Sequence, residues 1–233
     1  MSYDLWYWPG IPGRGEFVRI TLEAGAIPYR ERGREPDADI LAKLGSYEET
    51  PPFAPPWLDT GDLVIAQTAN ILLFLGKRHG LAPLDDRGRF WAHQLQLTIM
   101  DMTAEAHDVH HPVSVSAYYE EQKEAASQAA TAFRAERMPK YFRHFAKGLD
   151  AHGAFICGER WCYADLGLYV LISGLLFAFP RRMAALEPDF PSLFAHHARI
   201  GALPELQDYL GSDRHLPFSD GIFRHYPELD GED

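Results

Sequence analysis

The sequence predicts a small mixed α/β unit followed by an all-helical unit. Three observations lead to this prediction. Within residues 1–80, apolar side chains switch between the two-residue period of strands and the period of about 3.6 residues that helices have. From residue 87 onward they follow helical spacing, without strand-like alternation. The segment LAPLDD at 81–86 joins the two stretches and has the composition of a linker.

The start of the chain alternates strand and helix. A strand is expected over 3–8 (YDLWYW), and a helix over 14–24 (RGEFVRITLEA) that ends at Gly25. A second strand is expected over 28–32. Because a helix lies between the two strands, they should run parallel to each other.

A hairpin and a helix complete the first unit. Two short strands at 57–58 and 63–66 flank the turn-like residues 59–62, after a polar loop. A helix follows over 68–79 and ends at Gly80. The order strand, helix, strand, loop, hairpin, helix predicts a mixed sheet within about 80 residues.

The second unit is predicted to be helical throughout. Its helices are expected over 87–111, 120–152, 163–179, 192–200 and 204–210. Pro139 should bend the longest of them. The tail from residue 212 is polar, but part of it is expected to dock through four apolar side chains, Phe218, Ile222, Phe223 and Tyr226.

Charge and composition exclude several classes of function. The chain has 22 Lys and Arg against 33 Asp and Glu, a net charge of −11, which would repel nucleic acid and anionic membranes. The longest charge-free run, 166–180, is shorter than the roughly 20 residues of a membrane-spanning helix. The N-terminus lacks the pattern of an export signal. Two cysteines, Cys157 and Cys162, are too few for a disulfide framework and fit a reducing, cytoplasmic setting.

The end of the first strand carries candidate chemistry. The turn WPGIPGR at 8–14 contains no cysteine, so disulfide exchange is excluded there. Between Ser2 and Thr21 the side chains that can donate a hydrogen bond to a nucleophile near this strand end are Tyr7, Trp8 and Arg14. A phenol beside a helix N-terminus can stabilise an anion. Alternatively, Tyr7 is a core aromatic whose hydroxyl lies at the rim.

Three blocks together resemble the cytosolic glutathione transferases of the tyrosine type. The blocks are LWYWPGIPGRGEFVR, PPWLDTGDLVIAQTANILLFLG and CGERWCYADLGLYV. The resemblance implies a thioredoxin-like, glutathione-binding domain over 1–80, the linker 81–86, an all-helical domain over 87–211 and a partly docked tail over 212–233. It also implies a homodimer.

The resemblance implies a role for several residues. Tyr7 corresponds to the catalytic tyrosine, Trp8 belongs to the glutathione-binding set, and Arg14 corresponds to a basic residue near the glycyl carboxylate of glutathione. Pro56 corresponds to a proline with a cis peptide bond. That bond turns Pro55 so that its backbone faces the cysteinyl part of the tripeptide like an added strand.

Further residues match the other end of the tripeptide. Gln67 and Thr68 correspond to the pair that binds the γ-glutamyl group, and Thr68 precedes a helix, where its hydroxyl and free N–H groups can bind a carboxylate. On the sequence alone, Gln67 would be interpreted as a polar residue at a strand end and Thr68 as the N-cap of the helix. Glu105 corresponds to an acidic residue that reaches the glutamyl amine across a dimer, and Asp165 to a capping aspartate.

Two positions depart from the family pattern. Pro55 has no N–H to donate to the cysteinyl carbonyl, which should weaken glutathione binding by roughly 0.5 to 1.5 kcal/mol, or about two- to twelvefold. Cys162 stands where a serine or threonine N-cap is usual. Because a thiol accepts hydrogen bonds poorly, Asp165 and packing should carry this helix start.

Three histidines in HDVHHP, His107, His110 and His111, have the spacing of one helical face, which can bind a metal. No companion carboxylate or thiolate set is evident, and the resemblance implies no metal. We therefore expect them at the mouth of the second-substrate pocket or in solvent.

The expected function is conjugation of glutathione, as co-substrate, to a small hydrophobic electrophile. Tyr7 would act as a hydrogen-bond donor to the glutathione thiolate and not as a base. Two alternatives stay open: a non-catalytic glutathione- or ligand-binding protein of the same fold, which the missing N–H of Pro55 favours, and a glutathione-dependent isomerase or dehalogenase.

Overall fold

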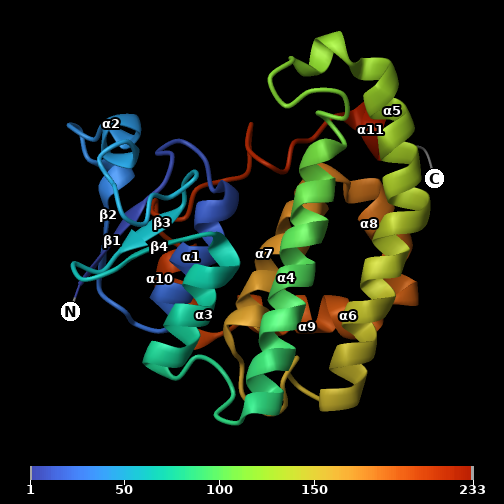
Figure 1. Ribbon diagram of the computed structural model, residues 1–233. Coiled ribbons are helices and arrows are strands. Elements are labelled where there is room, and N and C mark those ends of the chain that lie inside the picture. The colour runs from blue at the N-terminus through green and yellow to red at the C-terminus, as the bar shows by residue number, and fades with distance from the viewer. Residues whose placement is uncertain (1, 232–233) are drawn as a thin grey trace.

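The first part of the chain forms a four-stranded mixed sheet with helices on both faces. Residues 2–231 are described here from a computed structural model (Figure 1). The strands lie in the order β2-β1-β3-β4. Their bounds are β1 Tyr3–Trp6, β2 Tyr29–Glu31, β3 Trp57–Asp59 and β4 Val64–Ala66. β1 pairs with β2 in parallel and with β3 antiparallel, so the predicted mixed sheet is confirmed.

Two helices, α1 (Gly13–Ala24) and α3 (Thr68–His79), cover one face of this sheet. Tyr3 and Leu5 point to that face, because side chains alternate along a strand. They pack in a buried cluster with Val18, Leu22, Ile27, Leu58, Ile71 and Leu75.

The opposite face of the sheet packs under a short helix, α2 (Ile40–Leu44). There Trp6 stacks on Trp57, with ring centroids 5.5 Å apart, and Ile40 covers both. The sequence predicted only a polar loop at this point, and that prediction was wrong. With five residues and one buried side chain, α2 is too short to produce a periodic pattern.

Helices joined by loops dominate the rest of the described chain. The α-helices are α4 Asp86–Asp108, α5 Lys123–Ala132, α6 Met138–His152, α7 Tyr163–Ala178, α8 Pro180–Leu186, α9 Pro191–Gly201, α10 Pro204–Leu210 and α11 Pro227–Asp230. Short 3-10 turns cover Arg32–Arg34, Tyr119–Glu121 and Glu187–Asp189, and a π-helical turn covers Phe133–Arg137. The mixed α/β unit followed by an all-helical unit is therefore confirmed.

Two details of the helical part differ from the prediction. The helix expected over 120–152 is divided into α5 and α6 by the π-helical turn, which ends one residue before Met138 and the following Pro139. The helix expected to end near Phe179 is followed at once by α8, which the sequence did not indicate. Pro180 starts this helix, where its missing N–H is tolerated.

One buried core joins the two parts of the molecule. Phe17 of α1 and Leu72 of α3 belong to the same apolar cluster as Leu95 of α4 and Leu171 of α7. At Gly76 the contact is so close that a Cβ atom would lie 2.6 Å from the Tyr163 ring. This packing fixes α3 beside α4 and α7, and so fixes the position of any site between them.

The tail begins beside the first part of the chain, where α10 packs on α1, and crosses the molecule to α11 beside α5 and α8 (Figure 1). Phe223 is buried against Gly174 of α7, and the Ile222 carbonyl accepts a hydrogen bond from the His110 ring at 2.9 Å. A Cβ atom at Gly221 would lie 3.8 Å from Cβ of Ile11. The tail therefore passes over the turn between β1 and α1.

Within residues 2–231, no single helix has the length and apolarity needed to cross a bilayer. One pair of helices, Tyr163–Ala178 and Pro180–Asp189, meets those criteria only when taken together, and the pair is bent by 118°.

Candidate active site

Tyr7 lies directly after β1 and faces the N-terminus of α1. Its side chain is 4% exposed. The main-chain N–H of Arg14, in the first turn of α1, donates a hydrogen bond of 2.8 Å to the Tyr7 hydroxyl oxygen. Because that oxygen already accepts from the helix, its own proton is available to a further acceptor. The arrangement can therefore donate one hydrogen bond to an anion.

Three glycines, Gly13, Gly15 and Gly33, make room for Tyr7, and the contacts at Gly13 and Gly33 are the closest. Gly13 has φ +44°, and a Cβ atom there would lie 2.1 Å from the Tyr7 hydroxyl oxygen. A Cβ atom at Gly33 would lie 1.9 Å from the Tyr7 carbonyl oxygen. Any larger residue at either position would have to displace the tyrosine or its backbone.

The surroundings keep the Tyr7 hydroxyl protonated. Burial raises the pKa of Tyr7 above its ordinary value, and the Arg14 N–H and the charges of Arg14 and Arg19 oppose part of this rise. The Arg19 guanidinium lies 5.4 Å from the ring centroid and is held by Glu31 in two hydrogen bonds of 2.8 and 3.0 Å. At neutral pH Tyr7 is therefore a donor and not a base.

The predicted cis peptide bond is present between Pro55 and Pro56. β3 begins at the next residue, Trp57, which pairs with Trp6. Pro56 directly precedes β3 and Tyr7 directly follows β1, so both lie one residue beyond that pair. The Pro55 backbone therefore lies at the same end of the sheet as the Tyr7 side chain.

Gln67 and Thr68 form the start of α3. Gln67 adopts φ +67°, which is uncommon for a residue other than glycine. Such conformations cluster at functional sites. Thr68 is 4% exposed, and its hydroxyl has no hydrogen-bond partner within the described chain. A buried hydroxyl without a partner is expected to bind a group that the protein itself does not supply.

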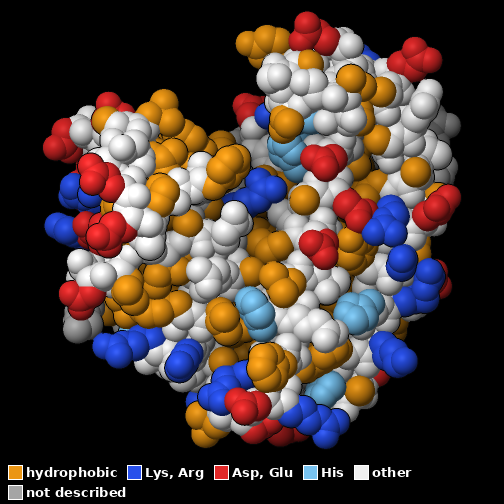
Figure 2. All heavy atoms as spheres, in the orientation of Figure 1, with side chains coloured by type: hydrophobic (Ala, Val, Ile, Leu, Met, Phe, Trp, Pro, Cys, Tyr) orange, Lys and Arg blue, Asp and Glu red, His pale blue; other side chains and the backbone are white. Residues whose placement is uncertain are grey.

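A hollow of about 280 Å³ brings Arg14 together with Gln67 and Thr68. It lies between the start of α3 and the middle of α4. Its lining is completed by Ala69, Asn70, His93, Leu97 and Met100. Figure 2 shows hydrophobic side chains gathered along the seam between the sheet-containing part and the helical part. A cation, a hydroxyl and helix N–H groups at one place suit a carboxylate ligand.

Sequence reasoning missed the contribution of α4 to this hollow. His93, Leu97 and Met100 are spaced four and three residues apart, which places them on one face of the helix. The neighbouring face, with Ala92, Leu95 and Ile99, is buried. Burial lowers the pKa of His93, so its ring is neutral. The spacing was visible in the sequence, but nothing there showed that this face meets α3.

Other predicted residues lie outside the hollow. Trp8 is 37% exposed on the turn after Tyr7, and Pro55 is half-buried. Glu105 binds the Arg137 guanidinium in two hydrogen bonds of 2.7 and 2.6 Å and accepts another from Tyr141 at 2.7 Å. Both partners lower the pKa of Glu105, and the hydrogen bond from Arg137 has the larger effect. The contact of Glu105 across a dimer stays a prediction.

Two of the three histidines, His110 and His111, hold the tail and its neighbouring loop. Their rings lie 4.7 to 5.1 Å apart between centroids. His110 bonds to the Ile222 carbonyl, and His111 to the Ala117 carbonyl at 3.1 Å. Burial lowers the pKa of His110 to about 3. Across residues 2–231 no group of three His, Cys, Asp or Glu side chains is arranged to hold a metal ion.

Asp165 carries the start of α7, as the sequence predicted. The Cys162 N–H donates to its carboxylate at 2.8 Å, and the Ile156 N–H does so at the same distance. The His196 ring bonds to it at 2.8 Å. The aspartate is fully buried, so its role is structural.

A larger hollow of about 690 Å³ lies near the start of α4, but none of the predicted site residues lines it. The smaller hollow is the better candidate for the site, because it gathers Arg14, Gln67 and Thr68 around an unpartnered buried hydroxyl.

The family model and the relatives that match this chain are described as glutathione S-transferases. A family model described as "Glutathione S-transferase, C-terminal domain" matches residues 107–213. The "Glutathione S-transferase" of Plasmodium falciparum is 24% identical over 88% of this chain and 93% of its own length. "Glutathione S-transferase alpha-1" of Rattus norvegicus is 28% identical over 88% of this chain and 87% of its own.

Solved structures share the fold. The Pi-class glutathione S-transferase of Onchocerca volvulus superposes with a TM-score of 0.72 at 21% identity, covering 91% of this chain and 93% of that one. A rat protein described as "hPGDS complexed with a quinoline" superposes with a TM-score of 0.69 at 18% identity, covering 90% and 96%.

Proposed function

Because the chain belongs to the glutathione S-transferase family, we propose that it joins the thiol of glutathione to a small hydrophobic electrophile, with Tyr7 activating the sulfur. The observation that carries this proposal is the hydrogen bond from the Arg14 N–H to the Tyr7 hydroxyl. It leaves the phenolic proton for the glutathione sulfur. The transferase is of the tyrosine type in this sense.

The tripeptide would extend from the hollow to Tyr7. Its γ-glutamyl carboxylate fits the hollow of Arg14, Gln67 and Thr68, where the Thr68 hydroxyl awaits a partner. From the resemblance alone, Arg14 would bind the glycyl carboxylate of glutathione. Because Arg14 lies beside Gln67 and Thr68 in the structure, we propose that it binds the γ-glutamyl carboxylate. The cysteinyl part then runs along Pro55, which places the sulfur at the Tyr7 hydroxyl.

The proposal requires only a moderate stabilisation of the glutathione thiolate. A free thiol has a pKa of about 8.5, so only a small part is thiolate at pH 7. Lowering that pKa by about two units would ionise most of the bound glutathione, and corresponds to roughly 2.7 kcal/mol. One phenolic hydrogen bond to a charged acceptor and the N-terminus of α1 together supply an effect of that size.

Tyr7→Phe tests the proposal. The variant should bind glutathione, but its bound thiolate absorbance at pH 7 should disappear, and turnover with an aryl halide should fall about 10²-fold. Tyr3→Phe is the matched control, because Tyr3 lies on β1, the strand that leads to Tyr7, is 2% exposed and bonds to His79. Unchanged thiolate absorbance in Tyr7→Phe would refute the role of Tyr7. Binding without any thiolate in the wild type would favour a non-catalytic binding protein.

We also propose a homodimer. Large apolar side chains are exposed on both parts of the chain: Phe53 is 89% exposed, Phe90 74% and Leu63 55%. A partner subunit would remove them from water. Light scattering should give twice the chain mass of 26.4 kDa, and Phe53→Ser should shift the protein toward monomer.

The two free thiols fit a cytoplasmic location, and a role in detoxification follows from the proposed reaction.

A further inference from the structure

Cys157 and Cys162 lie side by side immediately before α7. Their sulfur atoms are 3.7 Å apart, and both are free thiols. Cys162 is 2% exposed, whereas Cys157 is half-buried. A disulfide needs a sulfur separation of about 2.05 Å, so a small movement of one side chain would allow the bond to form.

The carboxylate of Asp165 brings the two thiols together. One oxygen accepts from the Ile156 N–H and the other from the Cys162 N–H, each at 2.8 Å. The segment that contains both cysteines is therefore fixed at its two ends by one buried group. Gly158, with φ +122°, turns the chain between them. Although Glu159 and Arg160 within the segment are exposed, the residues next to the two sulfurs are therefore held by a buried carboxylate.

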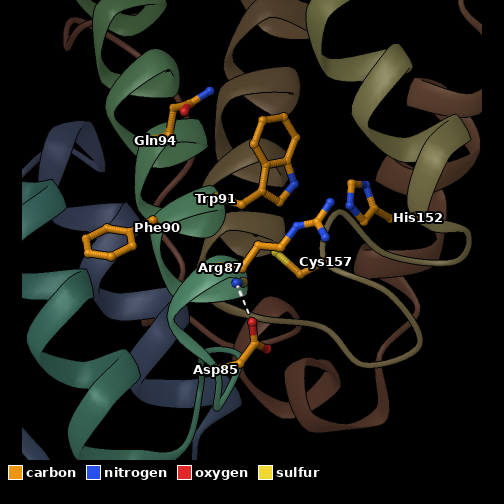
Figure 3. Close-up of a pocket in the computed structure, with 8 residues that line it drawn as sticks. Asp85, Arg87, Phe90, Trp91, Gln94, His152 and Cys157 are labelled. Carbon is orange, nitrogen blue, oxygen red and sulfur yellow. Dashed lines mark hydrogen bonds between the residues drawn. The ribbon is translucent and has the colours of Figure 1, made fainter.

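Small molecules can reach one of the two thiols. Cys157 lines the hollow of about 690 Å³ together with Arg87, Trp91 and His152, and Figure 3 shows these side chains around it. It also lines a second hollow of about 610 Å³, to which Cys162 contributes. Neither hollow shares a lining residue with the hollow of Arg14, Gln67 and Thr68.

The two thiols differ in reactivity. The hydrogen bond with Cys157, burial and the charge of Asp165 all raise the pKa of Cys162. Cys162 therefore stays protonated and is poorly placed to attack an external molecule. Cys157 is the thiol that an external molecule meets first.

We propose that Cys157 and Cys162 form a redox-active dithiol that small disulfides of low-molecular-weight thiols oxidise to an internal disulfide. The Cys157 thiolate attacks one sulfur of the external disulfide, whose S–S bond breaks and releases one thiolate. The Cys162 thiol then gives up its proton to solvent, its sulfur attacks Sγ of Cys157, and the second external thiolate leaves. The protein loses two electrons and two protons, and the external disulfide becomes two thiols.

Intact-mass measurement during incubation with glutathione disulfide tests this proposal. The wild type should lose the mass of two hydrogen atoms and accumulate no adduct, because Cys162 resolves the mixed disulfide. Cys162→Ser should accumulate one glutathionyl adduct on Cys157, and its serine suits the N-cap position. Cys157→Ser should remain unmodified. Hydroxyethyl disulfide, which lacks the tripeptide, should give the same pattern, so the result does not depend on glutathione binding near Tyr7.

Three results would overturn the inference. One is a stable adduct on wild-type Cys157 with no internal disulfide. Another is the absence of any reaction of either cysteine in the folded wild type, although both react after unfolding in denaturant. The third concerns an Asp165→Asn variant that has lost its fold. If its internal disulfide forms as fast as that of the wild type, the folded arrangement of the two cysteines does not promote the reaction.

Discussion

The main-chain N–H of Arg14 donates to the hydroxyl oxygen of Tyr7 at 2.8 Å, so the first turn of α1 fixes the orientation of the phenol. The hydroxyl keeps its proton because burial raises the pKa of Tyr7. Since the helix occupies one lone pair of the oxygen, the proton is directed away from α1. A group placed next to that proton would be stabilised as an anion.

Gly13→Ala should disable the site without removing a functional group. An alanine Cβ atom would lie 2.1 Å from the Tyr7 oxygen, at a backbone φ of +44° that disfavours alanine. We expect kcat with an aryl halide to fall at least about tenfold, since a displaced donor loses most of its effect. Gly10→Ala is the control, because nothing lies within 4 Å of that position. Equal kcat in both variants would contradict this prediction.

Thr68→Val should weaken glutathione binding selectively. It removes the buried hydroxyl that has no partner within the described chain while keeping the shape of the side chain. A hydrogen bond to a charged group is worth about 1.5 to 3 kcal/mol, so KM for glutathione should rise at least about tenfold with kcat nearly unchanged. Thr98→Val on α4 makes the same chemical change at a hydroxyl that bonds within its own helix. A loss of kcat with normal KM would argue against a binding role for Thr68.

Pro55→Ala should strengthen glutathione binding. It restores an N–H next to Pro56, where the proposed path of the cysteinyl carbonyl offers an acceptor. The gain should be about two- to twelvefold in Kd, measured by calorimetry. Pro51→Ala, at an exposed position in the same loop, should leave Kd unchanged. Weaker binding in Pro55→Ala would show that the rigid ring matters more than the missing donor.

The contribution of Glu16 to the stability of the fold should fall as the pH rises from 5 to 7.5, whereas buried histidines such as His110, whose pKa burial lowers, contribute in the opposite direction. Burial raises the pKa of Glu16 from 4.5 to about 7, although the Tyr209 hydroxyl donates to both of its oxygens at 2.7 and 2.9 Å. The folded state therefore binds a proton more tightly than the unfolded state. The resulting stabilisation is complete below pH 4.5 and lost above about pH 7, and amounts to about 3 kcal/mol.

Glu16→Gln isolates this effect. Unfolding in urea at pH 5 and pH 7.5 should show that the free energy of unfolding of the variant, relative to that of the wild type, increases with pH. Glu124→Gln changes an exposed carboxylate and should behave like the wild type. If the free energies of unfolding of the wild type and Glu16→Gln change in parallel between the two pH values, Glu16 does not contribute to the pH dependence.

Most of the fold could be predicted because its long elements have clear periodic patterns. The exceptions have physical causes. α2 buries only Ile40, so its sequence carries no stripe of apolar residues. Pro180 can end one helix or begin another, and here it begins α8, because the chain turns by 118° between the two helices.

The positions of candidate site residues could be predicted where they depend only on the neighbouring elements. Tyr7, Gln67 and Thr68 follow strand ends or begin a helix, so their positions follow from the elements around them. The role of His93 depends on which helix faces α4, and that is decided by the packing of the whole core. The left-handed backbone of Gln67 was equally invisible, because glutamine has no particular preference for it.

The path of the tail over Ile11 and Gly13 separates two properties of the molecule. The groups that we propose to hold and activate a sulfur come from the first hundred residues, whereas the segment above the turn comes from the far end of the chain. Substitutions near Gly221 can therefore change which partner molecules fit, while the machinery beneath stays intact. New substrate preferences could evolve in that segment at little risk to the reaction itself.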